Sequence, residues 1–346
     1  MQRQPQVSVI IPCRNEEHYI EKVIEDILHQ DYPIEKLEVL IIDGESDDQT
    51  QELILKKALK YPSIKLLKNP KKIVPTGLNI GIKEAKGEVI VRIDAHCEYP
   101  TNYISYLVQN LFELDADNVG VAMIAHPRNN SLKARAISMA ISSPFGIGDS
   151  HHRIGINEPI EIDSVPFGCY KSITFKNIGY FDEELIRNQD DEFNARLGKI
   201  GGKIYLLPDI EIKYLARDTI DKISKMFYYY GFFKPLVNKK VGSAATIRQF
   251  VPPLFVLSSI VAVLAALFST ELFYLLFLIT WIPYSFINLL VSLKLALKHK
   301  NLAFLPILFF IFIAIHYSYG IGYLKGWIRF QLFKKKVNFN DLSTNR

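Results

Sequence analysis

Short apolar runs rich in β-branched residues alternate with amphipathic stretches through the first third of the chain. The strand-like runs lie at 7–12, 37–43, 64–69 and 87–94, and the stretches with helical spacing of apolar residues lie at 19–28, 51–61 and 77–85. This alternation predicts an α/β domain with a mostly parallel sheet and helices on its faces. In such a sheet, ligands bind beyond the carboxyl ends of the strands.

The C-terminal part of the chain has a different pattern, with long runs that lack charged residues. Residues 251–270 and 272–293 contain no charged side chain, and 302–324 contain no Lys, Arg, Asp or Glu. A helix of about 20 apolar residues crosses a ~30 Å hydrocarbon core, and these runs lack the polar face of a helix packed on a soluble domain. We therefore expect about three transmembrane segments within 251–330.

Basic residues around these runs predict their orientation. Lysines are concentrated in 217–250 and in the loop after the second run, whereas the link FSTEL between the first two runs has none. Lys and Arg are enriched in cytoplasmic loops, so the catalytic domain should lie in the cytoplasm. Three full crossings would place the basic tail, 331–346, outside. Either the third segment, which contains Pro306 and the pair Gly320 and Gly322, is re-entrant or interfacial, or the tail breaks the rule.

Charge divides the chain into two parts. Residues 1–216 carry a net charge of −7, whereas 217–346 carry +12. The Gly- and Ser-rich region 127–160 contains an amphipathic piece at 131–143, which predicts either a mobile loop over the site or an interfacial helix. The predicted parts are a sheet domain at 1–216, a basic and aromatic juxtamembrane segment at 217–250, the transmembrane region at 251–330 and a basic tail at 331–346.

Two common nucleotide-binding motifs are absent from the sequence. No Gly-x-Gly-x-x-Gly follows the first strand, and no Walker lysine loop occurs, which disfavours a dehydrogenase or a P-loop ATPase. Polar residues nevertheless follow three of the predicted strands. These residues are Arg14, Asn15 and Glu16 after the first strand, Asp43, Gly44 and Glu45 at the second, and Asp94 and His96 at the fourth.

Four segments in order carry a resemblance to a known family. They are VSVIIPCRNEE, IIDGESDDQT, GLNIGIKEAKGEVIVRIDAHCEYP and NIGYFDEELIRNQDDEFNARL. Over roughly 6–235 the chain resembles inverting family-2 glycosyltransferases, especially the succinoglycan-type exopolysaccharide glucosyltransferases that end in a few membrane spans. The resemblance implies a GT-A, Rossmann-like domain followed by transmembrane helices, and a nucleoside-diphosphate sugar, expected to be a UDP-sugar, as the donor.

The same resemblance implies a donor site at the strand ends. Asp94-Ala95-His96 stands where the family has Asp-x-Asp, so Asp94 would contact the ribose and the metal, and His96 would be a metal ligand. An acidic domain needs a divalent cation to hold a diphosphate, and an imidazole ligand favours Mn²⁺ over Mg²⁺. Turn and helix capping are the alternative roles of Asp94 and Asn79. The residues implied for nucleotide-sugar binding are Pro12, Arg14, Asn15, Glu16, Asp43, Asn79 and Asp94.

Inverting transfer requires a general base that takes the proton of the acceptor hydroxyl. Gln189-Asp190-Asp191-Glu192 stands where the family has Glu-Asp-x-Glu, which implies that Asp190 is the base. Asp191 is an adjacent candidate, and Arg196 is close enough along the helix to orient the base or bind phosphate. Acidic residues are also favoured in a first helical turn by the helix dipole alone.

These expectations describe a membrane-anchored, metal-dependent inverting hexosyltransferase. It would be a multi-pass protein of the cytoplasmic membrane that transfers a sugar from a UDP-sugar to a lipid-linked saccharide acceptor in exopolysaccharide or envelope glycan synthesis. No nucleic-acid partner is expected. The alternatives are transfer to polyprenyl phosphate itself, and a catalytically silent nucleotide-sugar-binding scaffold protein in which Gln189 and His96 replace the usual acids.

Overall fold

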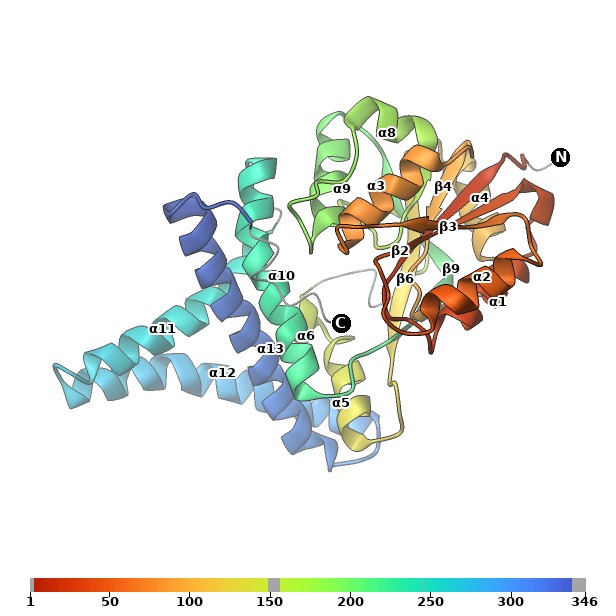
Figure 1. Cartoon of the computed structure of the whole chain (residues 1–346). Helices are drawn as coiled ribbons and strands as arrows, with labels where there is room; N and C mark the ends of the chain where they lie inside the picture. The colour runs from red at the N-terminus through yellow and green to blue at the C-terminus, as the bar shows by residue number, and fades with distance from the viewer. Residues whose placement is uncertain (1–2, 149–155, 245, 338–346) are drawn as a thin grey trace. The chain divides into compact units, whose positions relative to one another are not determined.

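The computed structural model describes residues 3–148, 156–244 and 246–337 (Figure 1). The chain divides into two compact units. The first contains Met1–Ile124 and His151–Tyr214, and the second contains Ala125–Ser150 and Leu215–Lys336. The amphipathic piece at 131–143 therefore shares a unit with the apolar C-terminal helices, whereas residues 149–155 of the same region lie outside the described part.

The first unit is built on a sheet that, within the described residues, has nine strands in the order β3-β2-β1-β4-β8-β6-β9-β5, with β7 paired to β9. The strands are β1 (Val7–Cys13), β2 (Leu37–Asp43), β3 (Ile64–Lys68), β4 (Val89–Arg92), β5 (Cys97–Glu98), β6 (Asn118–His126), β7 (Ile160–Glu161), β8 (Cys169–Lys171) and β9 (Ile204–Leu215). The helices are α1 (Ile20–Leu28), α2 (Thr50–Ala58), α3 (Val74–Glu84), α4 (Tyr103–Glu113), α8 (Ser172–Ile178) and α9 (Gln189–Lys199), with a short 3₁₀ turn η1 (Ile34–Lys36).

The sheet confirms the predicted α/β class and adds an antiparallel half. Strands β3, β2, β1 and β4 pair in parallel, and Cys13 at the end of β1 is in register with Asp43 at the end of β2. Beyond β4, strands β8, β6 and β5 enter antiparallel pairings. The strand order reverses at β1, because α1 and α2 lead to β2 and β3 on one side while α3 leads back to β4 on the other. The crevice at this reversal is where ligands bind in open α/β sheets.

Right-handed crossovers place the helices on both faces of the sheet. Helices α1 and α2 connect strands in one direction and α3 connects them in the other, so handedness puts α3 on the opposite face, as Figure 1 shows. All seven residues of β1 and of β2 are buried. A strand covered on both faces is expected to be a continuous apolar run, and this is why VSVIIP and LEVLIID lack alternation.

One face of the sheet is joined to α3, α8 and α9 by an aromatic core. The ring centroid of Phe193, on α9, lies 4.6 Å from that of Phe181 and 5.0 Å from that of Phe175. The buried members of this core are Ile10, Leu40, Ile42, Leu78, Ile82, Ile90, Tyr170, Phe175, Phe181 and Phe193. Because Phe193 is three residues after Asp190, this core fixes the position of the first turn of α9.

Removing the Phe193 ring should destabilise the first unit. Phe193 is fully buried, and a Phe→Ala change at such a site costs about 3–5 kcal/mol in the free energy of unfolding. We expect Phe193→Ala to lower the midpoint of chemical unfolding, whereas Ile173→Ala, at a side chain that is half exposed, should change it little. Equal effects of the two substitutions would show that the aromatic core does not hold α9.

The second unit is helical. Its helices are α5 (Leu132–Ala140), α6 (Pro144–Ile147), α10 (Ile220–Val241), η2 (Ile247–Phe250), α11 (Val251–Ala265), α12 (Thr270–Lys298), α13 (Phe304–Trp327) and the π-helical turn η3 (Ile328–Leu332). Within the described residues, three helical stretches are long and apolar enough to cross a membrane, and they are Ile247–Ala265, Thr270–Lys298 and Phe304–Leu332. These stretches coincide with the three apolar runs of the sequence.

Candidate active site

The loops after β1 and β2 are fastened to each other. The backbone N–H of Asn15 donates to Ser46 Oγ at 2.8 Å, and the side chain of Asn15 accepts from the N–H of Asp47 at 3.0 Å. The N–H of Glu16 donates to the hydroxyl of Thr50 at 2.8 Å. Asn15 adopts a left-handed backbone with φ of 55°, a conformation that costs energy outside glycine and that Asn tolerates best.

Asp43 is buried at the end of β2, and its carboxylate holds the turn that follows it. Its carboxylate accepts hydrogen bonds from the N–H and the hydroxyl of Ser46, at 3.0 and 2.5 Å, and from the Gln51 amide at 2.7 Å. Gly44 follows with the Arg14 side chain against it, because an added Cβ would lie 3.3 Å from Arg14 Cβ. Pro12 lies near the end of β1, beside the loops that contain Arg14 and Asp43. Contact between Asp43 and a nucleobase remains a prediction.

Three ionisable side chains meet where the loops after β1 and β4 come together. His96 Nδ1 lies 2.7 Å from Asp94 Oδ1 and 3.5 Å from Glu16 Oε1, and all three residues are buried. Burial alone lowers the pKa of His96, but the two carboxylates outweigh it, so this pKa lies above its ordinary value. The turn is held by Tyr99, whose hydroxyl accepts from the N–H of Asp94 at 2.8 Å. The structure thus brings together three of the residues predicted for the donor site, and their roles stay predictions.

The predicted base, Asp190, is bound by an arginine from the centre of the sheet. Arg92, the last residue of β4, donates from Nη1 to Asp190 Oδ1 and has a side chain only 6% exposed. Its guanidinium also lies over the Phe167 ring, 5.2 Å from the ring centroid. Burial raises the pKa of Asp190 above its ordinary value, and Arg92 opposes this by favouring the ionised carboxylate. A carboxylate with a raised pKa is a stronger base than an ordinary one, and its fixed orientation suits it to accept a proton.

Arg92 is not among the site residues predicted from the sequence, although the strand VIVRID carries a signal. Arg92 is the only charged residue of β4, and a charge inside a buried strand needs a partner. Side chains two residues apart in a strand point to the same face, so Arg92 belongs with Asp94. The identity of its partner depends on how α9 packs, which no local pattern specifies.

Arg196 does not orient Asp190, and this corrects the sequence interpretation. Its guanidinium is bound to Glu192, at 2.6 and 2.9 Å, and to the backbone carbonyls of Ile178 and Tyr180, at 2.5 and 2.7 Å. Residues four apart are neighbours on a helix surface and residues six apart are not. Arg196 therefore pairs with Glu192, and Asp190 pairs with Arg92. Asp191 is partly exposed and contributes to the raised pKa of Asp190.

Asn79 lies inside α3 rather than at its start. Its Nδ2 donates to the Phe181 carbonyl at 2.9 Å and to Glu183 Oε1 at 3.1 Å, and its Oδ1 accepts from the N–H of Phe181 at 3.0 Å. The buried amide therefore holds the 181–183 loop, which excludes the helix-capping alternative. Binding of a nucleotide by Asn79 stays a prediction.

The crevice contains donor groups of the kinds that bind a divalent cation, and in the structure they are hydrogen-bonded to each other. Asp94 and His96 offer a carboxylate oxygen and an imidazole nitrogen in direct contact, and Glu16 supplies a second carboxylate within 3.5 Å of that nitrogen. Among the described residues no group of three or more His, Cys, Asp or Glu is arranged to hold an ion. An ion at Asp94 and His96 would thus take most of its oxygen ligands from elsewhere, as Mg²⁺ and Mn²⁺ do when they bind substrate phosphates.

A comparison with solved structures defines the class of fold. The chain superposes with a TM-score of 0.60 on the mannosyltransferase PcManGT from Pyrobaculum calidifontis, solved in complex with GDP-Man and Mn²⁺. The match covers 96% of this chain and 89% of that one at 18% sequence identity. The fold is that of the GT-A glycosyltransferases, as the sequence motifs implied.

Sequence comparison gives the family. Residues 8–173 match the model of glycosyl transferase family 2. The dolichyl N-acetyl-alpha-D-glucosaminyl phosphate 3-beta-D-2,3-diacetamido-2,3-dideoxy-beta-D-glucuronosyltransferase of Methanococcus voltae is 32% identical over 240 residues, which are 68% of this chain and 74% of that protein. The succinoglycan biosynthesis protein ExoA of Rhizobium meliloti is 31% identical over 247 residues, 70% of this chain and 73% of that protein. The chain belongs to glycosyltransferase family 2.

Proposed function

We propose that the protein is a membrane-anchored, inverting glycosyltransferase that uses a divalent cation. It transfers a sugar from a nucleoside diphosphate, UDP by our prediction, to a lipid-linked saccharide at the cytoplasmic face of the membrane. This proposal rests mainly on the arrangement of side chains at the end of β4. Arg92 holds Asp190 there, and two residues later Asp94 meets His96, which also lies beside Glu16. One strand end thus supports a candidate base and a candidate diphosphate site together.

The cation is proposed to be Mn²⁺, with Asp94 and His96 as its protein ligands. When bound, it would neutralise the diphosphate and stabilise it as a leaving group. The imidazole of His96 favours Mn²⁺ over Mg²⁺. The net charge of −7 on residues 1–216 gives the domain a need for such an ion. PcManGT, whose fold this chain shares, was solved with Mn²⁺.

Asp190 is proposed to take the proton of the acceptor hydroxyl. As that proton moves to the carboxylate, the hydroxyl oxygen bonds to the anomeric carbon, and the bond from this carbon to the diphosphate oxygen breaks with its electrons on the leaving group. Attack from the face opposite the diphosphate inverts the anomeric configuration. Arg92 keeps the carboxylate ionised and aimed. Its buried Nε has no hydrogen-bond partner among the described residues.

The acceptor is proposed to be lipid-linked because the chain carries its own apolar helices. Three helical stretches are long and apolar enough for a membrane, and tethering the catalytic unit there raises the effective concentration of a lipid acceptor. The Methanococcus voltae relative is named for a dolichyl-linked saccharide phosphate, and the Rhizobium meliloti relative for succinoglycan biosynthesis. The first of these names describes a lipid-linked acceptor, and the second describes the synthesis of a polysaccharide.

A donor and acceptor panel tests the proposed substrates. Purified protein with Mn²⁺ would be given UDP-sugars or GDP-sugars, each with polyprenyl phosphate or with lipid-linked oligosaccharides, and release of the nucleoside diphosphate would be measured. We expect release with a UDP-sugar and the lipid-linked saccharide. Release with polyprenyl phosphate alone would instead identify a polyprenyl-phosphate glycosyltransferase, and release with none of the combinations would support a binding scaffold.

Replacing Arg92 should change the pH dependence of transfer. Activity requires ionised Asp190, so it falls as the pH drops through the pKa of that carboxyl, which burial already raises. Removing a neighbouring guanidinium raises a carboxyl pKa by about 1–3 pH units. We expect Arg92→Met to move the acidic limb of kcat/KM upward by that amount, and Arg92→Lys to move it less. An unmoved limb in both variants would show that Arg92 does not act through Asp190.

A further inference from the structure

Helix α13 satisfies the length and hydropathy criteria for a membrane span, but its neighbours are unusual for one. It is 24 residues long and continues into η3, and Lys325, Arg329 and a run of three lysines follow its middle. A third crossing would carry this basic end to the outer side of the membrane, against the tendency of Lys and Arg to stay in the cytoplasm. The packing of the second unit indicates how this conflict is resolved.

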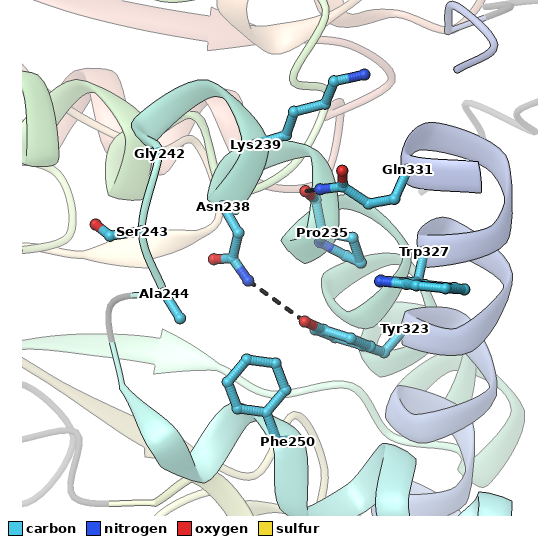
Figure 2. A pocket seen from close by; sticks show the side chains of 10 residues that line it. All are labelled: Pro235, Asn238, Lys239, Gly242, Ser243, Ala244, Phe250, Tyr323, Trp327 and Gln331. Carbon is cyan, nitrogen blue, oxygen red and sulfur yellow. Dashed lines mark hydrogen bonds between the residues drawn. The ribbon is translucent and has the colours of Figure 1, made fainter. Parts of the chain in front are cut away.

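Helix α10 runs beside α13 in the same direction. The contacts advance together, pairing Tyr228 with Gly322, Phe232 with Gly326 and Pro235 with Gln331. An added Cβ on either glycine would lie 2.1 Å from a carbonyl oxygen of α10, so the two backbones touch. Figure 2 shows the far end of this contact, where Tyr323 and Gln331 of α13 and η3 face Asn238 and Pro235 of α10 around a pocket.

Helix α10 cannot accompany α13 across a bilayer. Only eight residues separate Lys225 from Lys234, which is about 12 Å of helix against a hydrocarbon core of ~30 Å. Lys239, near the end of α10, is bound to the carbonyl of Phe330 at 2.9 Å. Because charged side chains at the bilayer centre are costly, α10 is an interfacial helix, and the half of α13 that follows it must lie at the same level.

The middle of α13 is hydrogen-bonded through His316. His316 Nε2 donates to the backbone carbonyl of Phe145 at 2.8 Å, while the Tyr284 hydroxyl bonds His316 Nδ1 at 3.0 Å. Phe145 belongs to α6, a helix of four residues that ends at Gly148 with φ of 72°. Short, irregular backbone is not found in the lipid-exposed core of a membrane. If α13 crossed the bilayer, its midpoint would draw this segment into that core.

The α11 and α12 hairpin crosses α13 rather than following it. α11 meets α13 where Pro252 and Val256 contact Gly320, and α12 meets it where Asn288 donates to the Phe309 carbonyl at 3.0 Å. The far end of the hairpin extends away from α13 in Figure 1. There Phe268 is 87% exposed, and Val263, Leu267 and Leu275 near it are also exposed.

Helix α13 exposes few of its large apolar side chains. Phe310 and Ile321 of α13 and Ile328 of η3 are exposed at spacings of 11 and 7 residues, which fall on one side of a helix. Trp327 is exposed on another side. The other sides pack on α10, α5, α11 and α12. Near the start of α13 the guanidinium of Arg135, on α5, lies 5.1 Å from the centroid of the Phe304 ring. Because its other sides pack on protein, α13 has only a small apolar surface left for acyl chains.

We propose that α13 lies along the cytoplasmic surface of the membrane together with α5, α6 and α10, and that the α11 and α12 hairpin alone crosses the bilayer. The inference rests on the membrane anchoring in the proposed function. It places the exposed side chains of Phe310, Ile321 and Ile328 against acyl chains. It also keeps the basic segment after α13 in the cytoplasm, beside anionic lipid head groups.

Cysteine labelling in spheroplasts tests this topology. The three native cysteines are buried, so exposed cysteines can be introduced singly as Phe268→Cys at the hairpin tip, Lys298→Cys at the end of α12 and Lys336→Cys after η3. With a membrane-impermeant maleimide, we expect labelling of Phe268→Cys in intact spheroplasts, and of Lys298→Cys and Lys336→Cys only after permeabilisation. Labelling of Lys336→Cys in intact spheroplasts would overturn the proposal, and so would protection of Phe268→Cys.

The labelling result is independent of catalysis. Sugar transfer would be assayed on membranes from the same spheroplasts, since accessibility of a cysteine does not require turnover. The expected labels in a chain that transfers no sugar would support the topology and contradict the proposed function. Sugar transfer together with labelling of Lys336→Cys in intact spheroplasts would support the proposed function and contradict the topology.

Discussion

Asp190→Asn is expected to lower the rate of sugar transfer by about 10²- to 10⁴-fold, the contribution typical of a general base. The amide has nearly the shape of the carboxylate but cannot accept the proton of the acceptor hydroxyl. Initial rates at saturating donor and acceptor measure the effect. Binding of the nucleotide, measured by calorimetry, should persist because the base acts on the acceptor side of the reaction.

Asp191→Asn is the matched control for this experiment. It makes the same chemical change one residue away, at a carboxylate that is partly exposed and does not form the Arg92 ion pair. We expect its rate to stay within a few fold of wild type. A large loss in Asp191→Asn with little loss in Asp190→Asn would transfer the role of base to Asp191. Normal rates of transfer in both variants would show that neither carboxylate acts as the general base.

Asp94→Ala is expected to abolish cation-dependent donor binding. A cation at a leaving diphosphate contributes several kcal/mol, so loss of its carboxylate ligand should cost about 100-fold or more in kcat/KM. Calorimetric titration of the UDP-sugar with and without Mn²⁺ measures the effect, and EDTA should reduce wild type to the same level.

Glu98→Ala is the control for the loss at Asp94, because this carboxylate lies two residues beyond His96 and pairs loosely with Lys213, at 3.8 Å, on the sheet edge. It should leave donor binding unchanged. Transfer by wild type that is insensitive to EDTA, or an Asp94→Ala variant that still binds the donor only when Mn²⁺ is present, would contradict the proposed metal site.

The strand ends can be located from the sequence because their signals are local. β1, β2 and β4 are apolar runs followed by polar turns, and a parallel sheet brings such turns to one edge. These local patterns suffice to group Glu16, Asp94 and His96. The helix that carries Asp190 is equally predictable, since acidic residues open an amphipathic stretch there.

The partners of those residues cannot be predicted in the same way because they depend on packing between distant segments. Arg92 and Asp190 are 98 residues apart, and their contact requires both the antiparallel β8 and the aromatic core around Phe193. Proximity along the chain suggests Arg196 as the partner of the base, whereas helix geometry pairs Arg196 with Glu192. The membership of residues 125–150 in the second unit likewise follows from their contacts with α13.

The anomeric configuration of the product made by the wild-type protein directly tests the proposed inverting transfer. A UDP-sugar with a ¹³C label at the anomeric carbon would be incubated with Mn²⁺ and a lipid-linked saccharide, and the lipid product would be examined by NMR. The account predicts a new glycosidic bond in the lipid fraction with the configuration opposite to that of the donor. A product that retains the donor configuration, or label recovered only as free sugar, would contradict it.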